Sequence, residues 1–220
     1  ELVIEDLKRN GIFIHLVKSY SEITEILDAL YKLYRRKTIF ISGSADNYAP
    51  LEEAEAKELI SRLAYGLVEK GYQLVNGYGK GIGSYVIDGV SEYCYSNNRK
   101  NISDYLTLMP FPLSSATKVN LKEIWTKYRE EMISSSGIAV MMFGNKKVGE
   151  NLLIADGMIE EVDLANKFGL DIVALNFTGG ATKEIGNHEE FSGIKIERFV
   201  DVETTVKEII EIIDELNKRR

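Results

Sequence analysis

The sequence feature that most constrains the fold is an alternation between short apolar runs and longer amphipathic segments. From residue 37 onward, each run rich in β-branched or aromatic side chains is followed by a stretch with helical periodicity. This alternation predicts βαβ units, and therefore a parallel sheet with helices on both faces. We accordingly expect an α/β fold, a Rossmann-like three-layer sandwich with a mostly parallel sheet.

The same periodicities place the individual elements. We expect strands at residues 38–41, 72–75, 104–109, 137–143, 171–175 and 194–199, and helices at residues 51–70, 83–95, 120–134, 152–168 and 202–216. The run at 137–143 is nearly all apolar, which fits a central strand because both faces of such a strand are covered.

The first part of the chain is expected to lie outside this sheet. Residues 11–17 predict a strand, residues 19–34 predict a helix, and a basic break follows at residues 35–37. One strand and one helix are too small to form a core. We therefore assign residues 1–36 to the trailing strand and helix of an upstream domain or to a connector, and residues 37–220 to the main domain. Because the chain begins without a methionine, we expect it to be part of a longer protein.

Composition argues against several classes of function. Lys and Arg number 27 against 34 Asp and Glu, and the net charge of −7 with a pI near 5.1 disfavours general nucleic-acid binding. Two histidines and one cysteine leave little for a metal site, and the lone cysteine fits a reducing cytoplasm. No apolar stretch is long enough to span a bilayer, so no membrane partner is expected.

Two glycine-containing loops follow expected strands, at the sheet edge where open α/β sheets bind ligands. The loop at Ser42, Gly43 and Ser44 has small side chains, which let backbone N–H groups approach an anion. The second loop holds four glycines and a lysine, namely Gly77, Gly79, Lys80, Gly81 and Gly83. It has neither the Rossmann fingerprint nor the P-loop sequence. It is either a phosphate cradle or a site of close helix–strand packing.

Charged and polar residues mark three further positions. Arg129 lies near the end of the helix that leads into the central strand, and arginine suits bidentate phosphate binding, although a lone helical arginine is more often solvated. Asn145 and Lys146 follow the central strand, and Glu161 lies in the next helix, where a carboxylate can accept from ribose or adenine. No G-x-S-x-G elbow is present, and we assign no catalytic residue.

Taken in order, these motifs resemble the SLOG superfamily, which includes the LOG-type nucleotide phosphoribohydrolases. Those enzymes pair an R-x-x-M helix with a later P-G-G-x-G-T-x-x-E loop and helix. Arg129 and Met132 match the first element, and Glu161 aligns with the last glutamate of the second.

The second element departs from the enzyme pattern. Residues 143–145 replace the proline and glycine pair, an insertion with Lys146 and Lys147 follows, and Met158 stands in place of the threonine. The resemblance therefore implies a nucleotide pocket that survives in a domain without hydrolase activity.

More narrowly, residues 37–45 and the glycine loop resemble the C-terminal SLOG domain of the ThsA family of Thoeris antiphage effectors. In that family a sirtuin-like domain hydrolyses NAD+, and the SLOG domain senses a cyclic ADP-ribose isomer made by a TIR-domain protein. The resemblance implies that residues 1–36 end a sirtuin-like domain and that residues 37–220 form the sensor. It also implies a cytoplasmic homo-oligomer, tetrameric or larger, with no cofactor in this part of the chain.

By that resemblance, Arg129, Lys146 and Glu161 are the principal ligand contacts. Ser42, Gly43 and the glycine loop would supply backbone donors to the pyrophosphate. Two alternatives remain, a LOG-like hydrolase of nucleoside monophosphates and an oligomerisation module with a vestigial pocket.

Overall fold

The computed structural model describes residues 2–12, 14–98, 101–112 and 120–218. The chain divides into two compact units, Glu1–Tyr34 and Arg35–Arg220, which we describe separately.

The first unit contains two helices, α1 (Leu2–Arg9) and most of α2 (Tyr20–Arg36). The prediction of a strand at residues 11–17 is wrong, because residues 11, 12 and 14–17 form no strand. Phe13 lies outside the described residues. Instead, Gly11 has a φ of 75° and follows α1, and the N–H of Ile12 donates to the carbonyl of Leu7 at 2.9 Å. These are features of a helix C-terminus that glycine closes. The assignment of residues 1–36 to an upstream domain stays a prediction.

The second unit contains a parallel sheet of six strands in its described residues, in the order β3-β2-β1-β4-β7-β8. The strands are β1 (Thr38–Ser44), β2 (Gln73–Asn76), β3 (Leu106–Leu108), β4 (Ile138–Phe143), β7 (Asp171–Ala174) and β8 (Ile194–Lys195). The order reverses between β1 and β4, which makes the carboxyl ends of these two strands the topological switch point. The expected Rossmann-like sheet is confirmed.

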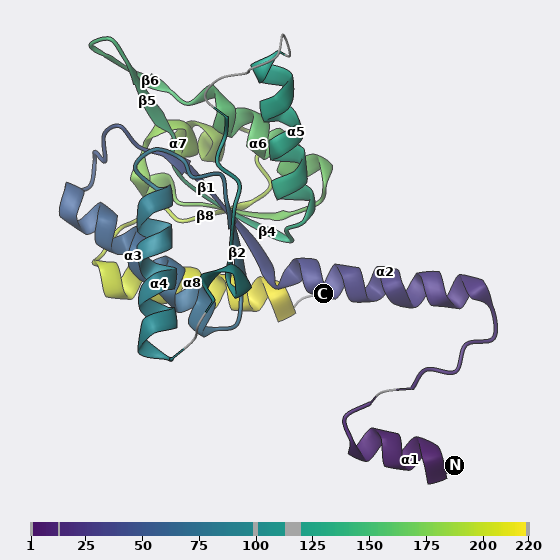
Figure 1. The fold of residues 1–220 in the computed structure, drawn as a ribbon. Helices are drawn as coiled ribbons and strands as arrows, with labels where there is room; N and C mark the ends of the chain where they lie inside the picture. The colour runs from purple at the N-terminus through teal and green to yellow at the C-terminus, as the bar shows by residue number, and fades with distance from the viewer. Residues whose placement is uncertain (1, 13, 99–100, 113–119, 219–220) are drawn as a thin grey trace. The chain divides into compact units, whose positions relative to one another are not determined.

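Helices cover both faces of the sheet (Figure 1). One face carries α3 (Glu53–Glu69), α4 (Gly83–Ser96) and α8 (Val202–Lys218), and the other carries α5 (Leu121–Ser134), α6 (Asp156–Lys167) and α7 (Gly180–Asn187). Successive residues of β1 divide between the two cores. Ile39 and Ile41 pack in the first core and Phe40 packs in the second, as the period of a strand requires.

A hairpin that the sequence analysis did not predict follows the central strand. Its strands β5 (Asn145–Val148) and β6 (Asn151–Ile154) pair in antiparallel register. The helix expected at residues 152–168 is therefore wrong in its first turn, and α6 begins at Asp156. Gly149, with a φ of 63°, supplies the backbone conformation of the two-residue connection. The hairpin extends beyond the sheet in Figure 1.

Candidate functional site

Most of the candidate residues gather at the carboxyl ends of β1 and β4. In this part of the sheet Ser42 pairs with Met141, and Gly43 pairs with Met142. The glycine loop runs into α4, and the hairpin runs into α6. Two helix N-termini therefore follow these loops, and the backbone dipoles there favour an anion.

A buried hydrogen-bonded cluster joins α5, α6 and β1. The hydroxyl of Ser42 donates to Oε2 of Glu161 at 2.5 Å, and Nε of Arg129 lies 3.2 Å from Oε1 of the same carboxylate. The side chains of Arg129 and Glu161 are 12% and 10% exposed. The two helical residues that the sequence singled out thus contact each other directly.

Glu160 provides a second carboxylate for the same arginine. Its Oε2 lies 2.9 Å from NH1 of Arg129, and its Oε1 accepts a 2.6 Å hydrogen bond from the hydroxyl of Thr126. The Glu160 side chain is 31% exposed, so this pair lies at the solvent-facing side of the cluster. Two carboxylates therefore share one guanidinium.

Burial raises the pKa of Glu161 above its ordinary value of 4.5. The hydrogen bond from Ser42 and the charge of Arg129 act in the opposite direction, because both stabilise the ionised form. Desolvation is the larger effect. The carboxyl is therefore easier to protonate than an exposed glutamic acid.

The guanidinium of Arg129 also lies between an aromatic ring and a glycine. It lies over the ring of Phe111, 4.9 Å from the ring centroid. A β-carbon on Gly157 would lie 2.5 Å from its NH2 atom. The glycine in the first turn of α6 thus leaves the space that the guanidinium fills.

Two lysines near this edge form ion pairs of their own. Lys146 on the hairpin pairs with Asp156 at the start of α6, and Lys80 in the glycine loop pairs with Asp46 after β1. The hydrogen bond from Lys146 lowers the pKa of Asp156, and that from Lys80 lowers the pKa of Asp46. Both carboxyl groups are therefore ionised at neutral pH.

Asn145 contacts the loop that follows β1. Its Oδ1 accepts from the N–H groups of Asp46 and Asn47 at 2.9 and 3.0 Å, and its Nδ2 donates to the carbonyl of Asn47 at 2.7 Å. The residue is 5% exposed. These bonds hold the loop after β1 against the start of the hairpin. A direct contact of Asn145 with a ligand stays a prediction.

The glycine loop packs closely against the loop that follows β1. A β-carbon on Gly79 would lie 2.0 Å from the carbonyl oxygen of Gly43, and one on Gly81 would lie 2.1 Å from that of Ala45. The N–H of Ala45 donates to the carbonyl of Lys80 at 2.7 Å. Close packing thus accounts for these glycines, and their contact with a phosphate stays a prediction.

The other two glycines of the loop are crowded as well. A β-carbon on Gly77 would lie 2.7 Å from the ring of Phe111, and one on Gly83 would lie 2.6 Å from Cα of Tyr78. The backbone of this loop can therefore approach its neighbours only because these glycines have no side chains.

Sequence reasoning predicted no contact between its candidate cations and three further carboxylates. Asp46, Asp156 and Glu160 hold Lys80, Lys146 and Arg129. Their partners lie far away in the sequence or across a hairpin that was not predicted. The one available signal was that Glu160 adjoins Glu161.

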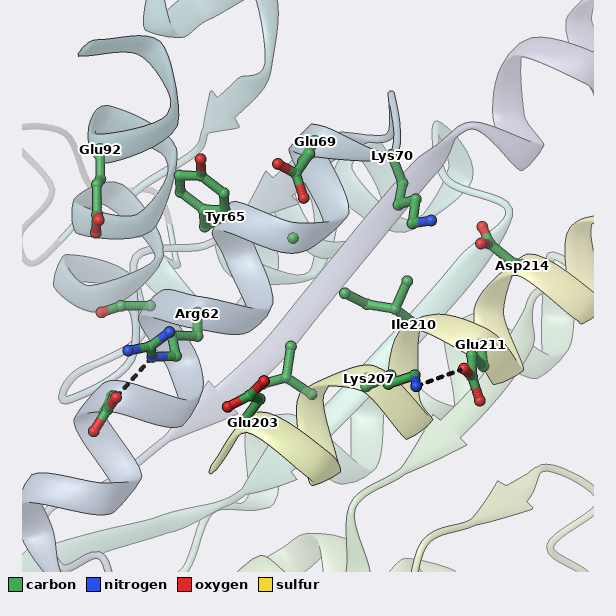
Figure 2. Close-up of a pocket in the computed structure, with 14 residues that line it drawn as sticks. Arg62, Tyr65, Glu69, Lys70, Glu92, Glu203, Lys207, Ile210, Glu211 and Asp214 are labelled. Carbon is green, nitrogen blue, oxygen red and sulfur yellow. Dashed lines mark hydrogen bonds and ion pairs between the residues drawn. The ribbon is translucent and has the colours of Figure 1, made fainter. Parts of the chain in front are cut away.

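A groove with a volume of about 720 Å³ is lined mainly by residues of α3 and α8 (Figure 2). Its carboxylates are Glu58, Glu69, Glu92, Glu203, Glu211 and Asp214, and its cations are Arg62, Lys70 and Lys207. Arg62 and Lys207 pair with carboxylates of their own helices. None of the residues that line this groove comes from a loop at the carboxyl end of a strand, where open α/β sheets bind ligands, so the groove is a weaker candidate site.

The described residues contain no group of three or more His, Cys, Asp or Glu side chains placed to hold a metal ion. None of the helices in the described ranges has the length and hydrophobicity that crossing a membrane requires.

Comparison with known proteins identifies relatives for nearly the whole chain. The Sir2- and TIR-associating SLOG family, STALD, matches residues 22–220. The NAD(+) hydrolase ThsA of Enterococcus faecium is 37% identical over 233 aligned positions, covering 99% of this chain and 48% of the relative. The NAD(+) hydrolase ThsA of Cytobacillus dafuensis is 38% identical over 187 positions, covering 84% of this chain and 38% of the relative. The chain thus spans about half or less of these curated relatives.

A solved structure supports the fold alone. The X-ray structure of TM1055, a structural genomics target, superposes with a TM-score of 0.50 and 18% identity, covering 79% of this chain and 98% of that one.

Proposed function

The chain belongs to the Sir2- and TIR-associating SLOG family, and on that premise we propose that it is the nucleotide-sensing regulatory domain of an NAD+-hydrolysing antiphage effector. Its signal is a cyclic ADP-ribose isomer made by a TIR-domain protein. The parent protein is a cytoplasmic homo-oligomer, tetrameric or larger, and its hydrolase activity lies outside this domain.

The observation that carries this proposal is the set of cations at the switch point. Arg129, Lys146 and Lys80 come from α5, the hairpin and the glycine loop, and all three pair with carboxylates around the carboxyl ends of β1 and β4. A ligand with two phosphates can exchange its charges for those carboxylates. The position of these cations beside two helix N-termini, at the edge where open α/β sheets bind ligands, supports an anionic ligand.

The relatives support the effector part of the proposal. Those of Enterococcus faecium and Cytobacillus dafuensis are named NAD(+) hydrolases, and each is more than twice as long as its matched region. The resemblance of residues 37–45 and of the glycine loop to Thoeris effectors supports a signal of the cyclic ADP-ribose type. Binding can activate another domain only if the ligand prefers one of two states of the protein.

Thermal unfolding in the presence of cyclic ADP-ribose isomers tests this proposal. A ligand at 100 times its Kd stabilises the folded state by about 2.7 kcal/mol, which raises Tm by several degrees. We expect a rise with one isomer, and we expect Arg129→Ala and Lys146→Ala to reduce it. Arg62→Ala is the matched control, because Arg62 lies in the α3–α8 groove. No rise with any isomer would contradict the proposal.

The second candidate function is hydrolysis of a nucleoside monophosphate, as in LOG-type enzymes. The direct contact of Arg129 with Glu161 favours it, because both residues match the motif of those enzymes. Release of the free base from AMP, abolished by Glu161→Gln, would support this alternative. We expect no release.

A further inference from the structure

The cations of the candidate site are already paired with carboxylates of the protein itself. Asp156 pairs with Lys146 between α6 and the hairpin, and Glu160 pairs with Arg129 between α6 and α5. A phosphate that binds either cation must therefore displace a carboxylate or share the cation with it. Both carboxylates add negative charge at the place where an anion would arrive.

Glu160 and Glu161 differ in how firmly they are held. Glu161 is 10% exposed and receives hydrogen bonds from both Ser42 and Arg129. Glu160 is 31% exposed, and its contacts with Arg129 and Thr126 lie within α5 and α6. Glu160 is thus the partner that Arg129 can exchange, whereas Glu161 remains as the fixed counter-charge.

Asp156 is exchangeable as well, because its side chain is 84% exposed. The two exchangeable carboxylates lie on one helix. Asp156 and Glu160 are four residues apart on α6, which corresponds to about 6 Å along the helix axis. Residues with this spacing lie on the same face of a helix. The two phosphate groups of a pyrophosphate share one bridging oxygen, so their outer oxygens span a similar length.

From these contacts we propose that Asp156 and Glu160 are built-in competitors of the ligand that determine its specificity. Each occupies the position of one phosphate, and full binding requires a ligand with two adjacent phosphates. This inference rests on the proposed function, and it concerns residues that contact the binding cations instead of the ligand. Neutralising either carboxylate should therefore tighten binding, opposite to the loss expected for the cations.

Calorimetric titration of inorganic pyrophosphate, inorganic phosphate and cyclic ADP-ribose isomers tests the proposal. The variants are Asp156→Asn, Glu160→Gln and the double variant. The control is Glu130→Gln, which removes a carboxylate between the same two helices, where Glu130 pairs with Lys167 at 3.2 Å. Thermal unfolding without ligand shows that each variant is folded.

We expect each single variant to bind pyrophosphate about two- to tenfold more tightly than the wild type, from the loss of one nearby negative charge. The double variant should bind pyrophosphate more tightly still. Its gain in affinity for inorganic phosphate should be smaller than its gain for pyrophosphate. Glu130→Gln should change affinity less than about twofold. Unchanged or weaker binding in both single variants would overturn the proposal. An equal gain for phosphate and pyrophosphate would overturn the requirement for two phosphates.

The outcomes also separate this inference from the proposed function. If the double variant gains pyrophosphate affinity but no protein binds a cyclic ADP-ribose isomer, the competitors are real and the proposed signal is wrong. If the wild type binds an isomer and the carboxylate variants bind it equally well, the proposed function stands and this inference fails. If no probe binds any of the proteins, both fail.

Discussion

The hydroxyl of Ser42 donates a 2.5 Å hydrogen bond to Glu161, and this contact joins strand β1 to the middle of α6. The other carboxylate oxygen of Glu161 contacts Arg129 on α5. One buried carboxyl thus connects three elements of the second unit. Because those elements belong to the sheet and its covering helices, the position of Arg129 is fixed by the scaffold.

Ser42→Ala should lower the free energy of unfolding by about 1–3 kcal/mol. The reason is that a buried carboxyl loses a hydrogen-bond donor that no solvent molecule can replace without rearrangement. Urea unfolding monitored by circular dichroism measures the change. Ser61→Ala is the control, because the Ser61 hydroxyl donates to the carbonyl of Lys57 within its own helix. Similar losses in the two variants would contradict a special role for the Ser42 contact.

The stability of the protein should depend on pH through Glu161. Its pKa in the folded state is raised above 4.5 by burial, so the folded state holds this proton more tightly than the unfolded state. As pH rises from about 4.5 through the folded-state pKa, the favourable contribution of the protonated carboxyl is lost. The contribution of Glu161 to the stability of the fold therefore falls as the pH rises through this range. Glu161→Gln, which cannot ionise, should lack this fall.

Urea unfolding of the wild type and of Glu161→Gln at several pH values measures this pH dependence of stability. The wild type should lose stability relative to Glu161→Gln as pH rises above about 4.5. A wild type that gains relative stability over the same range would show that Arg129 and Ser42 outweigh desolvation.

The fold was largely predictable from the sequence, because it depends on local periodicity. The apolar run of β4 predicts its central place, and the amphipathic stretches predict the helices of both faces. The failures have local causes. The hairpin β5–β6 is short, and the apolar pair Leu152 and Leu153 is as typical of the start of a helix as of a strand. Residues 11–17 have strand-like composition, but the described residues among them form no strand.

The site was less predictable, because its contacts join distant parts of the chain. Arg129 and Glu161 were singled out through resemblance, but the pattern along either helix does not show that they touch. The pairing of Lys146 with Asp156 depends on a hairpin that was not predicted. The side chain of Asn145 makes three hydrogen bonds with Asp46 and Asn47, in a loop whose shape no periodicity describes. Its structural contacts could be seen only in three dimensions.

Gly79→Ala should destabilise the fold by about 2–4 kcal/mol. The new β-carbon would lie 2.0 Å from the carbonyl oxygen of Gly43, so two backbone segments must separate. Gly71→Ala is the control, because Gly71 has a φ of 81° and open space around it. That variant should lose only the cost of a left-handed conformation, about 1–2 kcal/mol. Thermal and urea unfolding measure the stability of the two variants. A smaller loss of stability in Gly79→Ala than in Gly71→Ala would contradict the close packing of the two loops.

Gly157→Ala should weaken ligand binding without weakening the fold. The added β-carbon would lie 2.5 Å from NH2 of Arg129, the flexible end of a side chain, so the guanidinium moves while the backbone stays. Alanine in the first turn of α6 is also a better helix former than glycine by up to about 1 kcal/mol. Moving the guanidinium also strains its contacts with Glu160 and Glu161, which offsets the gain in helix propensity. We therefore expect little change in Tm without ligand, and about tenfold weaker binding of the isomer that stabilises the wild type.

A double-variant cycle with Arg129→Ala tests that explanation. If Gly157→Ala acts by displacing the guanidinium, it should have no further effect on affinity once Arg129 is absent. An equal loss of affinity in both backgrounds would show that Gly157 affects the ligand by another route, such as direct contact with the N-terminus of α6.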